Sequence, residues 1–422
     1  MPGPLPGILQ TLEGRRLFEV DFNPNVTETW TDNFHLTSSN KQQNFRTTLG
    51  SGTNVLINGA NTKASVAGQA GPTYDSSDPS GGVKFFPTVN AAVEQILSPR
   101  LTLSATDVFT RTDEPAQTNS FGLNTQRQTS SSNLFRLSAD WLMDLVATQG
   151  YYWNSYFTST GTTTVVNILG GNASTPIGPL NTARVGYEFT ASNTTGSTSD
   201  DAAAGYATSQ TVFGSLSHQT GQYSTAGIFS SYTLLSVDNA RIWNVSLFAT
   251  YGLRPSLSLS TSLGYSFLLS DNEPDTGIVT TNSTLRYTFT RAVMSVSVFQ
   301  DYLNTSTWGQ NFGVVRTTGY AGSFLYAFTP SVTGNLLASY TTGGNTGIGN
   351  TASTQSPNTL TAGGGLKWQT LGWLSTSLQY TYTVVNSGGN SGGNSSTGSG
   401  GTAQSSGNYT QNQVSFSLVG SF

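Results

Sequence analysis

The residues best suited to chemistry are few in this chain. It has two histidines and no cysteine in 422 residues. His35 follows Asp32 by three residues, a spacing that a catalytic Asp/His pair could use, whereas His218 lies in the segment HQTGQ. We expect His35 in a long polar loop and His218 in a turn at the opposite end of the fold. The two then cannot share a triad or a metal site, and a solvated loop is the favoured interpretation of Asp32 and His35.

The glycine-rich segment GGNTGIGN at 343–350 does not match a phosphate-binding loop. It is not followed by Lys-Ser/Thr, and no helix begins after it. The absence of cysteine also excludes disulfide scaffolds, thiolate metal sites and attachment of c-type haem within this chain. The sequence therefore predicts no enzyme, no catalytic residue, no resident cofactor and no metal site.

A long two-faced segment at 257–269 shows what kind of element predominates instead. Leucine, threonine and aromatic residues occupy its odd positions, and serine or glycine occupies most of its even positions. A period of two is typical of a strand with two unlike faces. Strands of soluble proteins usually have about five or six residues, whereas a tilted strand that crosses a bilayer needs about 9–11. The segment therefore favours a membrane-spanning strand with lipid on its leucine face.

The composition of the whole chain agrees with a membrane environment. Charged residues make up 9%, compared with about 25% in ordinary soluble domains. No stretch approaches 18 consecutive apolar residues, the length expected for a transmembrane helix. The remaining spanning structure is a closed β-barrel, because lipid cannot satisfy open backbone groups. The net charge of −4 does not suggest a nucleic-acid partner.

Short turns and long polar connections alternate along most of the chain, as in bacterial outer-membrane barrels. We expect an antiparallel up-and-down barrel of 18–20 strands over 18–422, after a periplasmic N-terminal segment at 1–17. That segment does not read as a complete signal peptide. The least certain strand is 161–169; if it and a neighbour stay in a loop, the count falls to eighteen. The Gly/Ser/Asn-rich stretch 386–408 is expected to be an exposed loop. The twenty expected strands are 18–30, 44–57, 62–74, 83–97, 101–112, 131–142, 146–158, 161–169, 182–192, 208–217, 223–235, 241–251, 257–269, 278–289, 293–302, 312–328, 332–341, 359–371, 374–386 and 409–422.

The alternation assigns charged side chains to the lumen. Five acidic and five basic residues share the inward phase, so the signs balance. This balance indicates either a weakly charge-selective lumen or ion pairs that brace neighbouring strands. Asp107 falls on the apolar face of its strand, which suggests a bulge or a position at the rim. The expected lumen-lining residues are Glu19, Asp21, Arg46, Glu94, Arg136, Asp140, Arg184, Glu188, Arg286 and Lys367.

The last strand ends in the sequence NQVSFSLVGSF. Phe416, Leu418 and the terminal Phe422 lie in one phase, and a C-terminal strand that ends in phenylalanine resembles the assembly signal of outer-membrane proteins. Gly420 departs from that signal, in which an aromatic residue is common at this position. The expected partners are accordingly the lipid bilayer of the outer membrane and the machinery that assembles barrels there.

The opening of the barrel, FEVDFNPNVTETWTDNFHLTSS at 18–39, resembles the bacterial outer-membrane family of the β-barrel porin 2 type. In that family the first strand commonly ends in Tyr-x-Asp-Asn and a hydrophobic residue, and here the step reads Trp30-Thr31-Asp32-Asn33-Phe34. The hairpin sequences FTPSVTGNLLASY and LRPSLSLSTSLGY are also similar to repeated hairpins of the family. The resemblance implies an integral outer-membrane barrel, often in gene neighbourhoods for exopolysaccharide export, and it supplies no catalytic residues.

We therefore expect a pore for small polar solutes in the outer membrane of a Gram-negative bacterium. Three alternatives remain open from the sequence. The barrel could be the outer-membrane component of an exopolysaccharide export machine, with a periplasmic partner docked on the short turns. It could form a sheath around a cytochrome from another chain. It could also be a structural or surface barrel that does not conduct.

Overall fold

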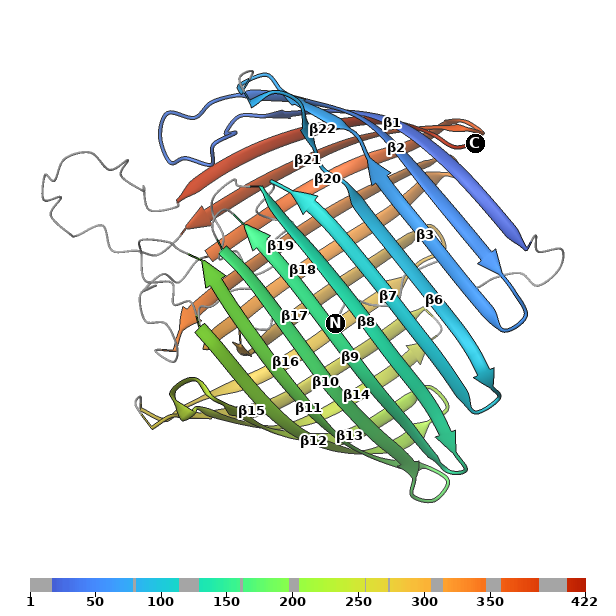
Figure 1. Ribbon diagram of the computed structural model, residues 1–422, viewed down its shortest axis with the longest axis vertical. Coiled ribbons are helices and arrows are strands. Elements are labelled where there is room, and N and C mark those ends of the chain that lie inside the picture. The colour runs from blue at the N-terminus through green and yellow to red at the C-terminus, as the bar shows by residue number, and fades with distance from the viewer. Residues whose placement is uncertain are drawn as a thin grey trace, which may run out of the picture.

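The computed structural model describes residues 17–78, 81–113, 129–159, 162–196, 205–254, 256–271, 274–304, 314–346, 358–386 and 408–422. Nearly all of them lie in one antiparallel sheet that closes on itself, because β1 pairs with both β2 and β22 (Figure 1). In the part of the chain that the structure describes, no helix is long and apolar enough to cross a membrane.

Twenty-two β-segments form twenty wall strands. β3 and β4 both pair with β2 and together make one wall strand, and β5 and β6 make the next. The segments are β1 (Phe18–Thr31), β2 (Asn44–Asn58), β3 (Thr62–Ala70), β4 (Pro72–Asp75), β5 (Lys84–Phe85), β6 (Thr88–Ser98), β7 (Leu101–Thr112), β8 (Ser130–Met143), β9 (Val146–Ser159), β10 (Thr162–Pro176), β11 (Asn181–Gly196), β12 (Gly205–Gly221), β13 (Ser224–Leu235), β14 (Arg241–Arg254), β15 (Leu257–Leu269), β16 (Thr276–Thr288), β17 (Ala292–Asn304), β18 (Val314–Thr329), β19 (Val332–Asn345), β20 (Asn358–Leu371), β21 (Leu374–Asn386) and β22 (Tyr409–Gly420).

These strands confirm the fold expected from the sequence, a closed 20-strand transmembrane β-barrel. The least certain strand, 161–169, is part of β10, which pairs with β9 and β11 along its length. Several strands extend further than the alternation indicates. β12 continues to Gly221, so His218 lies in a strand and not in a turn. The N-terminal segment 1–16 and most of the Gly/Ser/Asn-rich stretch, 387–407, lie outside the described residues.

The two ends of the barrel differ. At one end, here the turn end, nine connections of two to four residues join the strands, and both β1 and β22 have their outer termini there. The opposite end, here the loop end, lies at the left in Figure 1, and all of its connections except the one between β9 and β10 are longer. A barrel with an even number of strands places both termini of the sheet at the same end, as the sequence analysis assumes.

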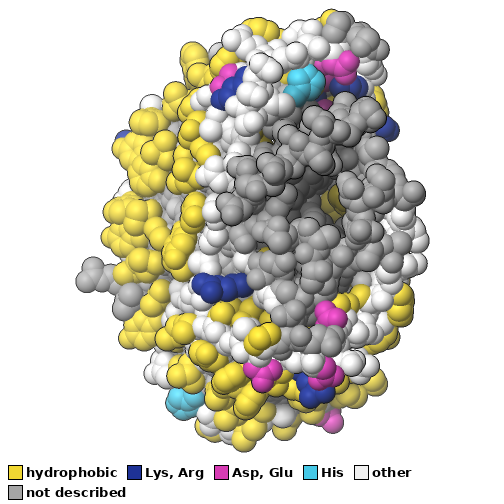
Figure 2. All heavy atoms as spheres, turned by 90° about the vertical axis from the view of Figure 1, so that its left-hand side faces the viewer, with side chains coloured by type: hydrophobic (Ala, Val, Ile, Leu, Met, Phe, Trp, Pro, Cys, Tyr) yellow, Lys and Arg dark blue, Asp and Glu magenta, His cyan; other side chains and the backbone are white. Residues whose placement is uncertain are grey.

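The two faces of the wall differ as the sequence predicts. Large apolar side chains are exposed on one phase, for example Leu247 at 66%, Leu263 at 60% and Leu336 at 61%. Figure 2 shows such side chains gathered along the outer flank of the molecule. Since one face of a closed barrel points outward and the other into the interior, the opposite phase, rich in serine and threonine, faces the lumen.

Asp107 is a correction to the sequence analysis. The ladders of β7 with β6 and with β8 are regular at Asp107, and the bulge between β6 and β7 lies between Ile96 and Ser98 instead. The carboxylate points to the outer face, where the side-chain amide of Asn133 donates a hydrogen bond to it at 2.9 Å. A cross-strand hydrogen bond, and not a bulge, therefore accommodates this charge.

Candidate pore lining and its loop-end mouth

The ten charged residues expected in the lumen all lie on strands and share the phase opposite the apolar belt. Among the described residues no two of the ten form an ion pair with each other. Glu94 instead lies 3.5 Å from Lys63, a further inward-facing residue of β3. Lys63 could have been found from the phase of its strand. That the ten residues line a conducting lumen stays a prediction.

Two inward arginines are held by aromatic rings rather than by carboxylates. The guanidinium carbon of Arg136 lies 4.8 Å from the ring centroid of Trp153, and that of Arg184 lies 5.7 Å from the ring of Phe213. Such cation–π contacts stabilise by about 0.5–2 kcal/mol and leave the charge uncompensated. Arg184 also donates a hydrogen bond from Nε to the side-chain oxygen of Asn172 at 3.1 Å.

Two of the inward acidic residues are held by neutral donors. The hydroxyl of Tyr151 donates to Glu188 at 2.8 Å, and the side-chain amide of Gln149 donates to Asp140 at 2.8 Å. No hydrogen bond or ion pair involves Arg286 or Lys367 among the described residues. Of the ten residues, only Arg46 and Glu94 form an ion pair with another described residue.

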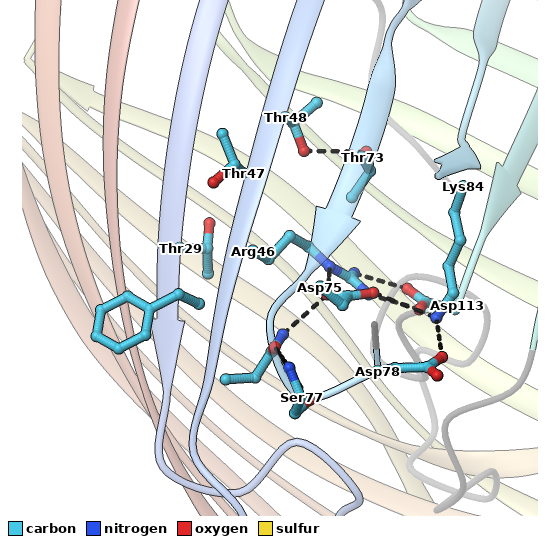
Figure 3. A network of polar contacts seen from close by, with 12 residues as sticks. Thr29, Arg46, Thr47, Thr48, Thr73, Asp75, Ser77, Asp78, Lys84 and Asp113 are labelled. Atoms are coloured by element: carbon cyan, nitrogen blue, oxygen red, sulfur yellow. Dashed lines mark hydrogen bonds and ion pairs between the residues drawn. The ribbon is translucent and has the colours of Figure 1, made fainter. Parts of the chain in front are cut away.

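Arg46 is the exception, because it is the centre of a buried network at the loop end (Figure 3). Its Nε and Nη2 donate to the two oxygens of Asp75 at 2.7 and 2.9 Å, and its Nη1 and Nη2 donate to Asp113 at 2.8 and 2.6 Å. Lys84 lies 3.2 Å from Asp75 and 3.1 Å from Asp78. Only 12% of the Arg46 side chain and 1% of the Asp75 side chain are exposed.

The network joins elements that are far apart in the sequence. Arg46 lies on β2, Asp75 at the end of β4, Lys84 on β5 and Asp113 directly after β7. Two-pronged pairing of a guanidinium with carboxylates is strong and directional. Arg46 was predicted from its inward position in the alternation, but neither of its carboxylate partners was. Asp113 follows a strand end, where alternation carries no information, and Asp75 needs the register of β2 with β4.

The connection 32–43 is fastened beside this network. Asn33 is completely buried, and its side-chain amide donates to the carbonyls of Thr37 and Thr410 at 2.8 Å each. Leu36 packs against Val385 and Tyr409, which belong to the inward phases of β21 and β22. The connection therefore lies against the inner wall and occupies part of the mouth at the loop end.

The Asp32 and His35 side chains have separate partners. The carboxylate of Asp32 accepts hydrogen bonds at 2.7 Å from the backbone and side-chain amides of Asn412, across the seam between β1 and β22. His35 is 2.8 Å from the side-chain oxygen of Gln42, and His218 is 2.8 Å from that of Asn181. The geometry of Asp32 is that of a clasp between the first and last strands and not that of a catalytic pair.

The residues of the expected assembly signal lie at this same seam. Phe416 and Leu418 are on the outer face of β22, opposite Glu28 and Val26 of β1. Phe422 exchanges two backbone hydrogen bonds of 3.0 Å with Phe22, and its ring stacks on Trp373 at 5.6 Å. Their role in assembly stays a prediction.

Comparison with known proteins supports the architecture alone. No family model and no curated protein matches the chain, so the resemblance to the β-barrel porin 2 type rests on the short motifs given above. Among solved structures, the chain is similar to the ferric enterobactin receptor PfeA of Pseudomonas aeruginosa in complex with BCV-L6, with TM-score 0.53, 11% identity and coverage of 96% and 81% of the two chains.

The siderophore receptor PirA gives comparable results from two organisms. For Acinetobacter baumannii the TM-score is 0.53 with 10% identity, and the match covers 96% of this chain and 80% of that one. For Pseudomonas aeruginosa the TM-score is 0.51 with 11% identity and coverage of 95% and 80%. Identities this low establish a common barrel fold and carry no information about ligands.

Proposed function

We propose that the protein is a non-enzymatic pore of the bacterial outer membrane for small polar solutes. The observation that carries the proposal is the inner wall. On β15 and β21 all inward positions except Leu268 and Val385 at the loop end carry small or polar residues, namely Ser258, Ser260, Ser262, Gly264, Ser266, Ser375, Ser377, Gln379, Thr381 and Thr383. Short side chains with hydroxyl and amide groups leave space and offer hydrogen bonds to water or to solute hydroxyls.

The size of the barrel supports the same proposal. Barrels of 16–18 strands leave an aqueous channel, and larger ones need a plug to close them. Within the described residues, every strand belongs to the wall and the only helix is a three-residue 3-10 turn at Val237–Asn239. No described element is therefore a plug. In the proposed orientation the loop end faces the cell exterior and the turn end faces the periplasm.

The test is single-channel recording in a planar bilayer across a salt gradient. We expect stable open steps and a reversal potential near zero, since acidic and basic residues are present in similar numbers on the inward phase, with Lys63 and Lys84 added to the five expected basic residues and Asp75 to the five expected acidic ones. Absence of conductance from protein shown to be folded by circular dichroism and heat modifiability would overturn the proposal.

Replacement of two inward cations sharpens this test. Arg286→Gln combined with Lys367→Gln removes two positive charges that have no described partner, so the reversal potential should shift toward that of a cation-selective pore. The matched control is Arg241→Gln on β14, which removes one positive charge from the outer phase. If the control shifts the reversal potential as much as the double variant does, the assignment of the inner face is wrong.

The proposal does not depend on an export machine, a cytochrome or a plug, and no observation among the described residues favours those alternatives. Conductance that is blocked by neutral oligosaccharides but not by monosaccharides would extend the solute class toward polysaccharide. Retention of haem by the purified protein would instead favour a barrel that forms a sheath around a cytochrome.

A further inference from the structure

The wall of the barrel is interrupted between β16 and β17 at the loop end. Their backbone pairing runs from Thr288 with Val293 to Thr281 with Gln300 and then stops. β16 nevertheless stays paired with β15 up to Thr276, and β17 stays paired with β18 up to Asn304. The facing edges 276–280 and 301–304 are therefore joined by no backbone ladder.

Side chains take the place of the missing ladder. The amide of Gln300 donates to the carbonyl of Val279 at 2.7 Å, and the hydroxyls of Thr276 and Tyr302 are 3.0 Å apart. The Tyr302 ring is 92% buried and belongs to an apolar cluster that includes Leu268. These contacts bridge the interruption, and a hollow remains beside them.

The hollow is a cavity of about 460 Å³. Its lining combines Tyr302 and Ile278 with Arg316 and with the hydroxyls of Thr318 and Thr342. Arg316, Thr318 and Thr342 belong to the outer phases of β18 and β19, the same phase as the exposed Tyr320. The cavity therefore reaches the outer face of the barrel, although Ile278 belongs to the inward phase of β16.

Arg316 is the charged group of this cavity. It is exposed, and among the described residues it has no ion-pair or hydrogen-bond partner. A guanidinium prefers a planar two-pronged contact with a phosphate or carboxylate, and the neighbouring hydroxyl of Thr342 can add a donor, whereas that of Thr318 donates to the side-chain oxygen of Gln300 at 3.0 Å. A positive charge without a described counterion beside a cavity indicates that the site takes an anion.

The position of the cavity relative to the aromatic residues identifies the rest of the ligand. Tyr320 and Tyr340 stack at 6.5 Å on the outer face, as expected for a membrane-interface girdle. Arg316 lies four residues beyond Tyr320 toward the loop end, which is about 13 Å along an extended strand. In the other direction the outer face continues into apolar wall with Val296, exposed at 46%, and Leu336. A ligand with a charged head in the cavity and an apolar tail along the wall would match this arrangement.

We propose that this cavity, between β16 and β19 at the loop end, is a binding site for the phosphate headgroup of an anionic lipid whose acyl chain lies along Tyr320 and Val296. The charged group of the site lies on the outer face, so lipid binding there does not depend on solute passage through the lumen.

The test uses purified full-length protein in a non-ionic detergent, titrated with dioleoyl phosphatidylglycerol and measured by native mass spectrometry. The wild-type chain should retain the lipid. Arg316→Gln should weaken retention about tenfold, because a charge-assisted hydrogen-bond pair is removed. The matched control is Arg241→Gln, also on the outer face at the loop end, where Arg241 lies 3.8 Å from Asp271. The control should retain the lipid like the wild type.

A second variant tests the cavity without removing the charge. A Cβ at Gly344 would meet only Arg316 atoms, at 3.9 Å, so a larger side chain can be introduced there without a backbone clash. Gly344→Trp should fill the hollow and reduce lipid retention although Arg316 is kept. Conductance of each variant equal to that of the wild type shows that the barrel is folded.

Two further probes separate an anionic lipid from a neutral lipid and from a free phosphate. Dioleoyl phosphatidylcholine, whose headgroup is neutral overall, and glycerol 3-phosphate, which lacks a tail, should both bind more weakly than phosphatidylglycerol. Equal binding of glycerol 3-phosphate, or undiminished retention of phosphatidylglycerol by Arg316→Gln, would overturn the proposal.

Discussion

At the loop end the wall departs from a plain ladder in two regions, beside Gly71 and beyond Gln300. In the first region β3 gives way to β4, and a Cβ at Gly71 would lie 2.1 Å from the carbonyl oxygen of Leu49, so the two backbones approach closely. In the second region β16 and β17 separate. The ion pairs of Arg46 close the first break. The side chains of Tyr302 and Gln300 close the second.

The arginines of the two regions show what the difference means. Arg46 faces inward and is matched by Asp75 and Asp113. Arg316 faces outward and has no described counterion. A compensated charge holds the wall together, whereas an uncompensated one at a cavity is available to a ligand. Residue type alone therefore does not separate a structural arginine from a binding one in this barrel.

Removal of the Arg46 side chain should give the largest effect. Arg46→Ala leaves two buried carboxylates without their main cation, and breaking a buried pair in this way typically costs about 3–5 kcal/mol. We expect a lower midpoint in urea unfolding from lipid vesicles, and noisier open-channel current because the connection 32–43 loses an anchor. Arg46→Lys is the matched control and should recover part of the stability. A midpoint equal to that of the wild type would show that the network contributes nothing.

Truncation at the second break should cost somewhat less. Tyr302→Ala removes a buried ring from an apolar cluster, and such truncations cost about 3–5 kcal/mol in well-packed cores. The neighbouring cavity already interrupts the packing here, so we expect the lower part of that range. Tyr302→Phe keeps the ring and loses only the hydroxyl contact with Thr276, so it measures the contribution of the hydroxyl to the free energy of unfolding. Urea unfolding checks both variants, and equal losses from the two would contradict a packing role for the ring.

The smallest effect is expected at Gln300. Gln300→Leu removes the donor to the Val279 carbonyl and the acceptor of the Thr318 hydroxyl, and each such hydrogen bond contributes about 0.5–1.5 kcal/mol to the free energy of unfolding. Gln369→Leu at the turn end, where the side-chain amide donates to Leu371 at 2.8 Å, is the matched comparison. If Gln369→Leu alters lipid retention at the cavity as much as Gln300→Leu does, the effect does not come from the second break.

The alternation of apolar and polar residues was sufficient to predict the twenty strands, because lipid-facing and lumen-facing residues alternate along each strand of a transmembrane barrel. It also placed Arg46 and Lys367 in the inward phase. It could not supply the partners of Arg46, since Asp75 lies 29 residues away and Asp113 lies 67 residues away. The separation of β16 from β17 was not predicted either, because alternation assigns the faces within a strand and not the backbone pairing between strands.

The seam between β1 and β22 closes the barrel and is shorter than the ladder between β1 and β2. Seven residue pairs join these strands, whereas fourteen join β1 to β2. Thr27 and Ser417, which meet across it, are 390 positions apart in the chain. Closing such a loop is entropically costly, and contacts of this separation slow folding. We therefore infer that ring closure is the last and slowest step in the assembly of this barrel, and that the clasp between Asp32 and Asn412 forms only when it is complete.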